Sequence, residues 1–394
     1  MKKKIITRPI WILSLVSLFT DVSSEMLYPV MPLFLKSIGF SILLIGILEG
    51  LAEATAGLSK GYFGQLSDAK GKRVPFIRFG YLLSALSKPM MALFAYPLWI
   101  FFARTSDRLG KGIRTSARDA YLSDQTTKEH KGKVFGFHRA FDTIGAFMGP
   151  IAALILLHFY PQQYKLLFML AIFPGIVSIL LTFLLKEHSP TISVPKTKPT
   201  FFSFIAFVRL SPVHYKRLVI GLLLFTLFNS SDVFLLLVMK QAGFTDFNLI
   251  LAYIFYNLIY AIFAYPIGAL ADRIGLKTLL VVGFFLFTVV YAGFAFNTNA
   301  IIFFALLFIY GIYAACSESI GKAWITNIIP QHETATAIGA FTAFNSLATM
   351  LASTAAGVIW FLWGSAATMC LSAAAVAIVA VYFIIFVPYK HYTT

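Results

Sequence analysis

Residues Leu98–Asp124 read LWIFFARTSDRLGKGIRTSARDAYLSD. Charged side chains recur in this stretch at helical spacing, within an arc of about 120° when each residue advances by about 100°. They are Arg104, Asp107, Arg108, Lys111, Arg114 and Arg118. The opposite side is apolar, so the stretch predicts a helix with one basic face. A solvated helix in a loop is the ordinary reading of such a face, and the rest of the chain argues against it.

The composition indicates a membrane protein. The 394 residues have a mean hydropathy of +0.81 and only 12% of them are charged, whereas about 25% are charged in soluble domains. Apolar segments of about 20 residues recur along the chain, each long enough to cross a bilayer. The first, Pro9–Leu35, is too long for a signal sequence, so we expect a retained helix. Cys316 and Cys370 lie far apart in apolar segments and indicate neither a disulfide framework nor a metal cluster.

The distribution of basic residues predicts the topology. We expect twelve transmembrane helices, at 10–35, 41–66, 74–96, 98–123, 134–158, 165–186, 217–240, 247–269, 278–297, 299–328, 335–361 and 365–387. Alternate connections then carry 19 Lys and Arg on one side and 3 on the other, which predicts that both termini are cytoplasmic. The segment 98–123 must span, because every later connection would otherwise invert. The net charge of +16 therefore reflects topology and does not indicate nucleic-acid binding.

A basic face within a bilayer needs anionic partners, because each charge facing lipid costs about 2.5–3.5 kcal/mol on insertion scales. Acidic residues occur at helical spacing in neighbouring spans. They are Asp21 and Glu25 in the first span, Glu49 and Glu53 in the second, and Asp142 in the fifth, and Lys88 lies near the middle of the third. These groups predict a polar interior within a helix bundle. Structural ion pairs are the plain alternative, although buried charge is a costly way to gain stability.

The second half of the chain is less charged. Asn229 and Asp232 lie one turn apart in the seventh predicted span, and Tyr256 and Asn257 lie in the eighth. Glu318 and Lys322 in the tenth span can neutralise each other at i,i+4 spacing. Between the halves, the segment 190–212 is polar and rich in proline at first, and then predicts a short helix at the membrane surface. We therefore expect two six-helix domains, 1–189 and 213–394, joined by a cytoplasmic linker.

A ten-residue motif occurs once in each half. Gly64–Arg73 reads GQLSDAKGKR and Gly268–Lys277 reads GALADRIGLK, with an offset of 204 residues. Each copy follows the second predicted span of its half. Glycine permits close helix approach and positive φ, and an aspartate at such a turn can meet the N-terminus of a neighbouring helix. The repeat predicts two halves with the same internal organisation.

The doubled motif resembles the signature loop of the major facilitator superfamily, and the resemblance extends over the whole chain. Gly64, Asp68, Gly71, Lys72 and Arg73 match in the first copy, and Gly268, Asp272 and Arg273 match in the second. Arg104 stands where this family often has an arginine implicated in proton coupling. Gly145–Pro150 resembles the fifth-helix motif of drug:proton antiporters, although alanines replace its last glycine pair.

The resemblance implies an all-α membrane protein with twelve transmembrane helices in two pseudo-symmetric six-helix bundles that rock to give alternating access. No phosphate-binding G-x-x-x-x-G-K-[ST] loop occurs, so ATP is not expected to be the direct energy source, and we expect a secondary active transporter. An enzyme would need a nucleophile–base pair or a metal set, for which His130 and His138 near Asp142 are a poor fit, so we do not expect an enzyme. Its substrate is expected to be an anionic or zwitterionic organic solute, and its transport is expected to be coupled to protons, with multidrug efflux by drug:proton antiport as the alternative. A channel, a scaffold or a lipid-handling protein is a third reading. We expect a monomer in the bacterial cytoplasmic membrane, with no cofactor, metal or nucleic acid.

Three groups of residues are predicted to carry this function. The substrate-binding group is Arg104, Arg108, Tyr28, Lys88, Asn229, Asp232, Tyr256 and Asn257. The proton-coupling group is Asp21, Glu25, Glu49, Glu53, Asp107 and Asp142. The gating group is Gly64, Asp68, Gly71, Arg73, Gly268, Asp272, Arg273, Arg114 and Arg118.

Overall fold

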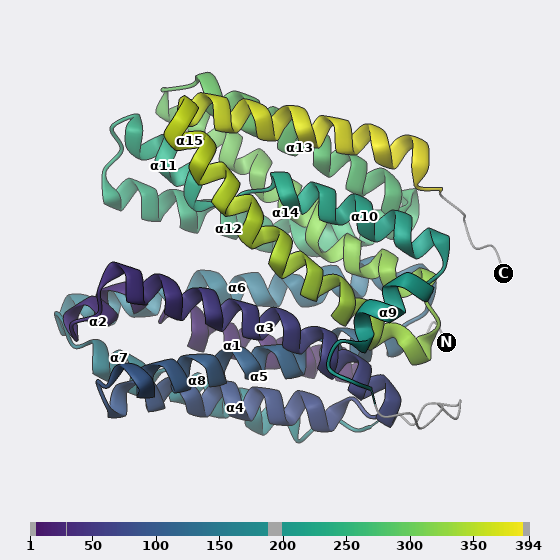
Figure 1. Cartoon of the computed structure of the whole chain (residues 1–394), viewed down its shortest axis with the longest axis horizontal. Coiled ribbons are helices and arrows are strands. Elements are labelled where there is room, and N and C mark those ends of the chain that lie inside the picture. Colours follow the sequence, from purple (N-terminus) through teal and green to yellow (C-terminus); the bar gives the residue numbers. More distant parts are fainter. Residues whose placement is uncertain (1–4, 29, 188–198, 389–394) are drawn as a thin grey trace. The chain divides into compact units, whose positions relative to one another are not determined.

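Helices dominate the structure, a computed structural model that describes residues 5–28, 30–187 and 199–388 (Figure 1). No strand occurs among these residues. The chain divides into two units. The first comprises 1–127, 141–209 and 330–343, and the second comprises 128–140, 210–329 and 344–394. The units depart from the two halves of the sequence at 128–140 and 330–343, the segments in which the long helices α6 and α15 begin.

The first unit is a helix bundle in which the charged helix α5 lies next to α3 and α4. α5 (Pro97–Asp124) packs against α3 (Ile42–Lys70) and α4 (Val74–Leu93), and α1 (Arg8–Glu25) packs against α8 (Ile172–Thr182). A proline in the first turn of α1, α4 and α5 favours helix initiation there. The unit also contains α2 (Met31–Ser37), α7 (Tyr164–Leu170), α9 (Ser203–Leu210) and the greater part of α6 (Lys131–Phe159).

Glycine allows α4 and α5 to touch along their backbones. A Cβ atom added at Gly80 would lie 2.7 Å from the carbonyl oxygen of Gly110, and one added at Gly110 would lie 2.7 Å from that of Gly80. Real Cβ atoms do not approach a backbone so closely, so neither position accepts a side chain without a shift of the helices. This contact fixes α5 against α4.

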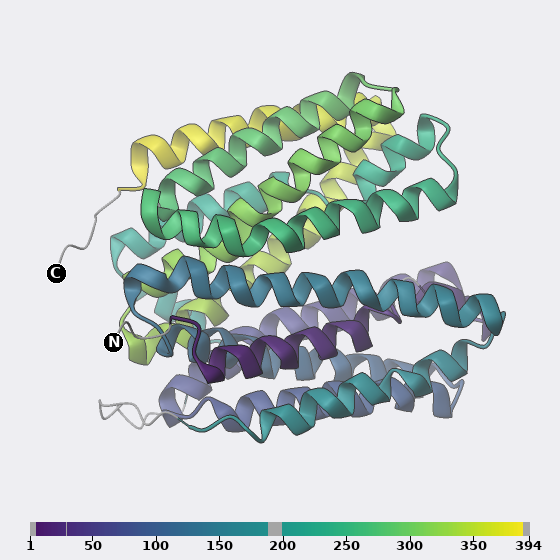
Figure 2. The same ribbon diagram turned by 180° about the vertical axis from the view of Figure 1, so that it is seen from behind.

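The second unit has an aromatic core. α14 (Ala300–Ile328) packs against α12 (Asp246–Ile274) and α13 (Leu276–Phe296), as Figures 1 and 2 both show. Phe287 stacks on Tyr291 with ring centroids 3.9 Å apart, and Phe225 stacks on Phe284 at 4.6 Å. The unit also contains α10 (Val213–Phe228), α11 (Val233–Gln241) and most of α15 (Thr334–Phe386).

Several predicted spans are interrupted. The first consists of α1 and α2, the sixth of α7 and α8, and the seventh of α10 and α11. α15 covers the eleventh and twelfth predicted spans and turns at Gly364, whose φ is 84°. The prediction that Asn229 and Asp232 lie one turn apart within a continuous helix is wrong, because both occupy the break between α10 and α11.

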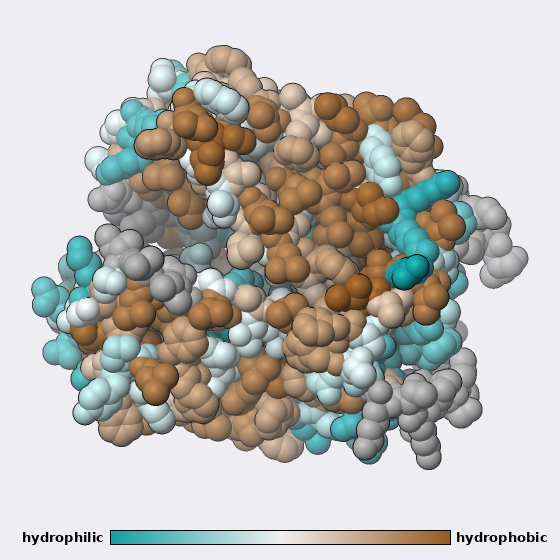
Figure 3. Space-filling view, viewed as in Figure 1, coloured by the Kyte–Doolittle hydropathy of each residue, from teal (hydrophilic) through white to brown (hydrophobic). Residues whose placement is uncertain are grey.

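The exposed surface is apolar, as expected of a membrane protein. In the described part of the chain, seven helical segments are long and apolar enough to cross a membrane. α1, α3, α4 and α5 are not among them, and each carries charged residues within its length. Hydrophobic side chains cover most of the face shown in Figure 3, and Phe361 and Leu98 are 87% and 82% exposed. Such exposure is unfavourable in water and favourable in lipid.

Part of the predicted linker is helical. Its first residues, up to 198, lie outside the described residues, and α9 lies within its second part. The ring of Phe204 on α9 fills a notch at Gly61 on α3, where an added Cβ would lie 2.8 Å from Cδ1 of the ring. Ser203 Oγ also donates to Gln65 Oε1 at 2.5 Å. α9 is therefore attached to α3.

Candidate functional site

Most of the charged face of α5 is buried within the first unit, although Lys111 is exposed. Arg104, Asp107 and Arg114 are 6%, 8% and 5% exposed, and Asp119 is 1% exposed. Buried charges are found where other polar groups satisfy them. The buried part of the face therefore lies against protein, in agreement with the polar interior that the sequence predicts.

A cavity of about 40 Å³ is lined by residues of α1, α4 and α5 and by the segment after α1. This volume has room for a few water molecules. The lining includes Tyr28 and eight charged residues, namely Asp21, Glu25, Lys88, Arg104, Asp107, Arg108, Lys111 and Arg114. Five of these are cationic and three are acidic, so the lining has a surplus of two positive charges.

Two glutamates of α3 pair with arginines of the cavity lining. Arg104 donates through Nε to Glu49 Oε1 at 2.9 Å and through Nη2 to Glu49 Oε2 at 2.7 Å, a bidentate pair. Its Nη1 lies 3.6 Å from Asp107 Oδ2. Arg108 makes a looser pair, with 3.9 Å between its Nη1 and Glu53 Oε2. Glu49 and Glu53 thus lie beside the cavity without forming part of its lining.

Serines hold two further cations. Lys88 is 2% exposed, and its Nζ donates to Ser23 Oγ at 2.9 Å. Arg114 Nη1 donates to Ser84 Oγ at 2.6 Å, and the guanidinium lies 4.4 Å from the ring centroid of Tyr81. Arg114, which is predicted to belong to the gating group, also lines the cavity.

The remaining charged residues of the first unit extend this network. Arg118 donates through Nη1 to Ser17 Oγ at 3.0 Å and pairs with Asp119 at 2.9 Å. Asp142 is buried on α6, three residues before Gly145. A Cβ added at Gly145 would lie 2.6 Å from the Leu18 carbonyl oxygen of α1. The glycines of α6 thereby bring it into backbone contact with the acidic part of α1.

The second unit holds a single carboxylate between two tyrosines. Asp232 accepts hydrogen bonds from the hydroxyls of Tyr256 at 2.6 Å and Tyr310 at 2.5 Å. Asn257 donates to the carbonyl of Tyr253 at 2.9 Å. The break between α10 and α11 brings Asp232 to the tyrosines of α12 and α14, so the interruption of the helix serves this contact.

An ion pair joins α6 to α14 within the second unit. Glu318 of α14 forms an ion pair with Arg139 of α6. Arg139 Nε also donates to the Tyr260 hydroxyl at 2.6 Å.

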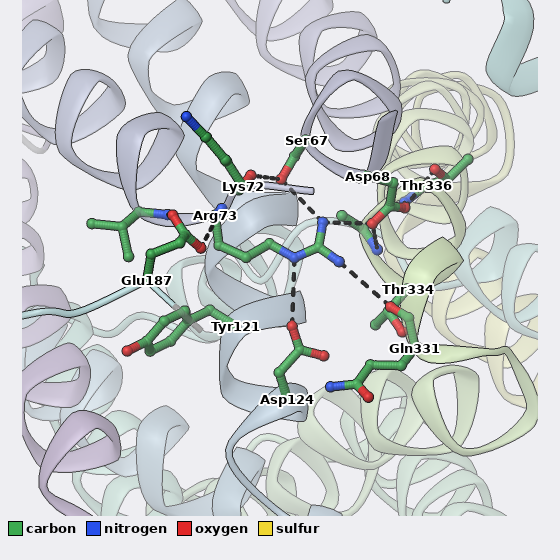
Figure 4. Close-up of polar contacts among 12 residues, drawn as sticks. Ser67, Asp68, Lys72, Arg73, Tyr121, Asp124, Glu187, Gln331, Thr334 and Thr336 are labelled. Atoms are coloured by element: carbon green, nitrogen blue, oxygen red, sulfur yellow. Dashed lines mark hydrogen bonds and ion pairs between the residues drawn. The ribbon is translucent and has the colours of Figure 1, made fainter. Parts of the chain in front are cut away.

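The first copy of the repeated motif forms a buried polar cluster (Figure 4). Asp68 is 5% exposed and pairs with Arg73 Nη1 at 2.5 Å. Its Oδ2 accepts from the backbone N–H and the hydroxyl of Thr336, each at 2.6 Å. Thr336 lies in the first turn of α15, where backbone N–H groups have no helical acceptor and favour an anion. Asp68 therefore caps α15 while neutralising an arginine.

Arg73 connects this cluster to two further carboxylates. Its Nε lies 3.5 Å from Asp124 Oδ2. Glu187 accepts from the backbone N–H groups of Arg73 at 2.9 Å and Val74 at 3.0 Å, and so caps α4. Burial alone would lower the pKa of Arg73, but the Asp68 and Asp124 carboxylates raise that pKa above its ordinary value. The guanidinium is therefore charged at any physiological pH.

The second copy repeats the cap without the arginine. Asp272 accepts from the backbone N–H groups of Gly132 and Lys133 at the start of α6, each at 2.8 Å. Lys277 occupies the position that corresponds to Arg73, and its Nζ donates to backbone carbonyls near the end of α15, including that of Val387 at 2.8 Å. Arg273 is exposed. The aspartates of the two copies have the same role towards a helix N-terminus, but only the first faces a buried guanidinium.

The predicted site residues thus fall into separate groups. Tyr28, Lys88, Arg104 and Arg108 belong to the first unit, whereas Asn229, Asp232, Tyr256 and Asn257 belong to the second. The sequence analysis did not identify several partners of the charged residues, namely Ser23, Ser84, Tyr310, Glu187 and Thr336. Serines within otherwise apolar segments were the available signal. In the described part of the chain, no group of three or more His, Cys, Asp or Glu residues is placed to hold a metal ion.

Comparison with known proteins identifies the family. The chain matches the sequence model of the Major Facilitator Superfamily over residues 13–259 and 237–393. It is 31% identical over 373 residues to an MFS-type transporter of Methanocaldococcus jannaschii, covering 91% of this chain and 92% of that one. It is 24% identical over 288 residues, 69% of each chain, to the multi-drug resistance efflux pump PmrA of Streptococcus pneumoniae.

A solved structure shows the same fold. The human organic anion transporter MFSD10 superimposes with a TM-score of 0.82 at 16% sequence identity, over 95% of this chain and 99% of that one. The family match covers nearly the whole sequence and agrees with the repeated motif and the helical architecture. The chain therefore belongs to the major facilitator superfamily of transporters.

Proposed function

We propose that this transporter carries a small organic anion or zwitterion across the bacterial cytoplasmic membrane by alternating access, coupled to protons. The observation that supports this most is the cavity lining of the first unit, with its surplus of two positive charges. Arginine binds a carboxylate through two parallel hydrogen bonds, as Arg104 does with Glu49. The three acids of the same lining suit an ammonium group, so a zwitterion falls within the proposal.

In this proposal each predicted group of residues has a separate role. Tyr28, Lys88, Arg104 and Arg108 bind the charged end of the substrate, and Asn229, Asp232, Tyr256 and Asn257 contact its organic body. Gly64, Asp68, Gly71, Arg73, Gly268, Asp272, Arg273, Arg114 and Arg118 govern opening and closing. The protein acts as a monomer with both termini in the cytoplasm, and the bundles 1–189 and 213–394 are the moving bodies, joined by the linker 190–212.

Ligand binding to the purified protein tests the substrate class. Thermal unfolding is measured with a panel of organic anions and with lipophilic cations, for the unmodified chain, for Arg108→Gln and for Lys36→Gln, which alters an exposed cation on α2. We expect anions to raise the melting temperature, and Arg108→Gln to weaken their binding about tenfold, equivalent to about 1.4 kcal/mol. Lys36→Gln should change nothing. Binding of lipophilic cations alone, unaffected by Arg108→Gln, would exclude an anionic substrate.

Proton coupling is proposed to use carboxylates that compete with protons for nearby cations. The candidates are Asp21, Glu25, Glu49, Glu53, Asp107 and Asp142. In proteoliposomes, neutralising a coupling residue, for example by Asp21→Asn, should abolish accumulation driven by a pH gradient and leave counterflow intact. Counterflow needs no pH gradient, so it separates loss of coupling from loss of transport. If neutralising each of Asp21, Glu25, Glu49 and Glu53 leaves pH-driven transport unchanged, carboxylate coupling at these residues is wrong.

Multidrug efflux by drug:proton antiport is the second candidate. It is supported by the similarity to the efflux pump PmrA, by the backbone contact of Gly145 with α1 and by the aromatic core of the second unit. The same binding panel discriminates between the candidates, because an efflux pump for lipophilic cations does not need the cationic lining.

A further inference from the structure

Two residues of α3 and two of α5 form a ladder of matched spacing. Glu49 and Glu53 are four residues apart, as are Arg104 and Arg108. Glu49 is bound to Arg104 at 2.7 and 2.9 Å, and Glu53 lies 3.9 Å from Arg108. Four residues of α-helix rise by about 6 Å. Two guanidinium groups separated by about one helical turn thus each face a carboxylate of this chain.

The two sides of the ladder differ in exposure. The side chains of Arg104 and Arg108 are 7% and 13% exposed, whereas those of Glu49 and Glu53 are 36% and 51% exposed. A partly exposed carboxylate can replace its arginine partner by water at little cost, whereas a buried guanidinium needs an anionic partner. The arginines are therefore the fixed part of the ladder, and the glutamates are the part that can leave.

The surplus positive charge of the cavity lining equals the combined negative charge of Glu49 and Glu53. The lining contains Arg104 and Arg108 and has a surplus of two positive charges. Glu49 and Glu53 lie outside the lining and supply two negative charges. Any two anionic groups that reached the arginines from the cavity would balance the lining equally well.

Arg108 is not fully satisfied in the state described. Its Nε has no hydrogen-bond partner among the described residues although it is buried. The distance of 3.9 Å to Glu53 exceeds that of a hydrogen bond. A buried donor left unpaired is unfavourable, so the position favours a ligand that supplies an acceptor.

We propose that Glu49 and Glu53 hold the places of two anionic groups of the substrate, which is therefore a compound with two anionic groups about 6 Å apart, such as a dicarboxylate. One carboxylate of the substrate completes the coordination of Arg108, and the other replaces Glu49 at Arg104. The inference rests on the proposed function, because it concerns the same cationic lining. It adds the number and the spacing of the anionic groups and the role of the α3 glutamates as competitors.

Calorimetric titration of the purified full-length protein with straight-chain dicarboxylates of four to seven carbons tests this inference. Monocarboxylates of the same lengths serve as the ligand control. We expect tightest binding for the dicarboxylates whose carboxylates lie about 6 Å apart, and binding at least tenfold weaker for each matched monocarboxylate. Arg108→Gln should reduce dicarboxylate affinity at least tenfold.

The decisive variants remove the competing carboxylates. Glu49→Gln and Glu53→Gln should each tighten dicarboxylate binding several-fold, because the substrate no longer displaces a charged group. Glu333→Gln removes a carboxylate that is 43% exposed and pairs with His332, and it should leave the affinity unchanged. Size-exclusion chromatography reports whether Glu49→Gln reduces folding. If it does, Glu53→Gln still tests the inference, because this substitution removes only the loose pair with Arg108.

The outcomes separate this inference from the function on which it rests. If both glutamate variants bind dicarboxylates as the unmodified chain does, or more weakly, the glutamates are not competitors. If monocarboxylates bind as tightly as dicarboxylates and Arg108→Gln weakens both, the substrate is an anion with one charged group, and only the inference fails. If no carboxylate binds while a lipophilic cation does, the proposed function fails as well.

Discussion

At the scale of single residues, the two repeated aspartates differ in what they neutralise. Asp68 is buried and satisfies both Arg73 and the N-terminus of α15. Asp272 caps α6 in the same way, but within the described ranges no guanidinium pairs with it, since Lys277 stands at the corresponding position and binds carbonyl groups. A charge that holds another buried charge is harder to remove than one that only caps a helix.

We therefore expect Asp68→Asn to destabilise the protein more than Asp272→Asn. Removing one partner of a buried ion pair costs about 3–5 kcal/mol, whereas losing a helix cap costs about 0.5–2 kcal/mol. Thermal unfolding of the two purified variants measures the difference. Equal losses of stability would mean that Arg73 finds enough compensation in Asp124.

At the scale of helices, glycine determines how closely α4 and α5 approach. An alanine at Gly110 would place its Cβ 2.7 Å from the Gly80 carbonyl oxygen. We expect Gly110→Ala to lower the free energy of unfolding by about 1–3 kcal/mol, because the helices must separate. Gly50→Ala is the matched control, since nothing lies within 4 Å of the added Cβ, and it should be neutral or stabilising by up to about 1 kcal/mol. A stable Gly110→Ala protein would show that the contact is not tight in solution.

Most helices could be predicted from apolar length and charge, and the interruptions could not. The break after Phe228 coincides with four consecutive polar residues, Asn229, Ser230, Ser231 and Asp232, inside an otherwise apolar segment. A polar run of this kind also occurs within continuous spans, so hydropathy alone does not distinguish a continuous span from a broken one. The contact of Asp232 with tyrosines of two other helices favours this break, and such a contact depends on tertiary structure. The turn within α15 was easier to predict than the break after Phe228, because it falls at a glycine, Gly364, and glycine adopts positive φ readily.

The sequence predicted which face of α5 carries the site, but not which residues of other helices pair with that face. Helical spacing placed Arg104 and Arg108 on one side of α5 and indicated that this side is buried. Spacing within a helix carries no information on which acid of another helix reaches which arginine, so the pairing with Glu49 and Glu53 emerged only from the packing of α3 on α5. Glu187 was missed for the same reason, because its partner α4 lies more than a hundred residues earlier in the chain.

At the scale of the whole molecule, the asymmetry of basic residues predicts cytoplasmic termini. Lys36 and Lys128 lie in connections on opposite sides of the membrane in this topology, and both are exposed. Lys131 is a poor probe, because it is 7% exposed and its Nζ donates to the Thr326 carbonyl. In a variant with Cys316 and Cys370 replaced, an impermeant thiol reagent should label Lys36→Cys in intact cells and Lys128→Cys only after permeabilisation. Labelling of Lys128→Cys in intact cells would show that the predicted topology is inverted.

The order of the charged helices also affects how the chain is made. α5 carries so many cations that it would enter a bilayer by itself only at high cost, since each Arg or Lys near the centre of a helix opposes insertion by about 2.5–3.5 kcal/mol. The acids that neutralise it, Glu49 and Glu53 among them, lie earlier in the sequence. A ribosome therefore delivers the anionic helices α1 and α3 to the membrane first. When α5 leaves the translocon, the helices that carry its counter-charges are already in the membrane. Synthesis from the N-terminus therefore allows insertion of a helix that would not insert by itself.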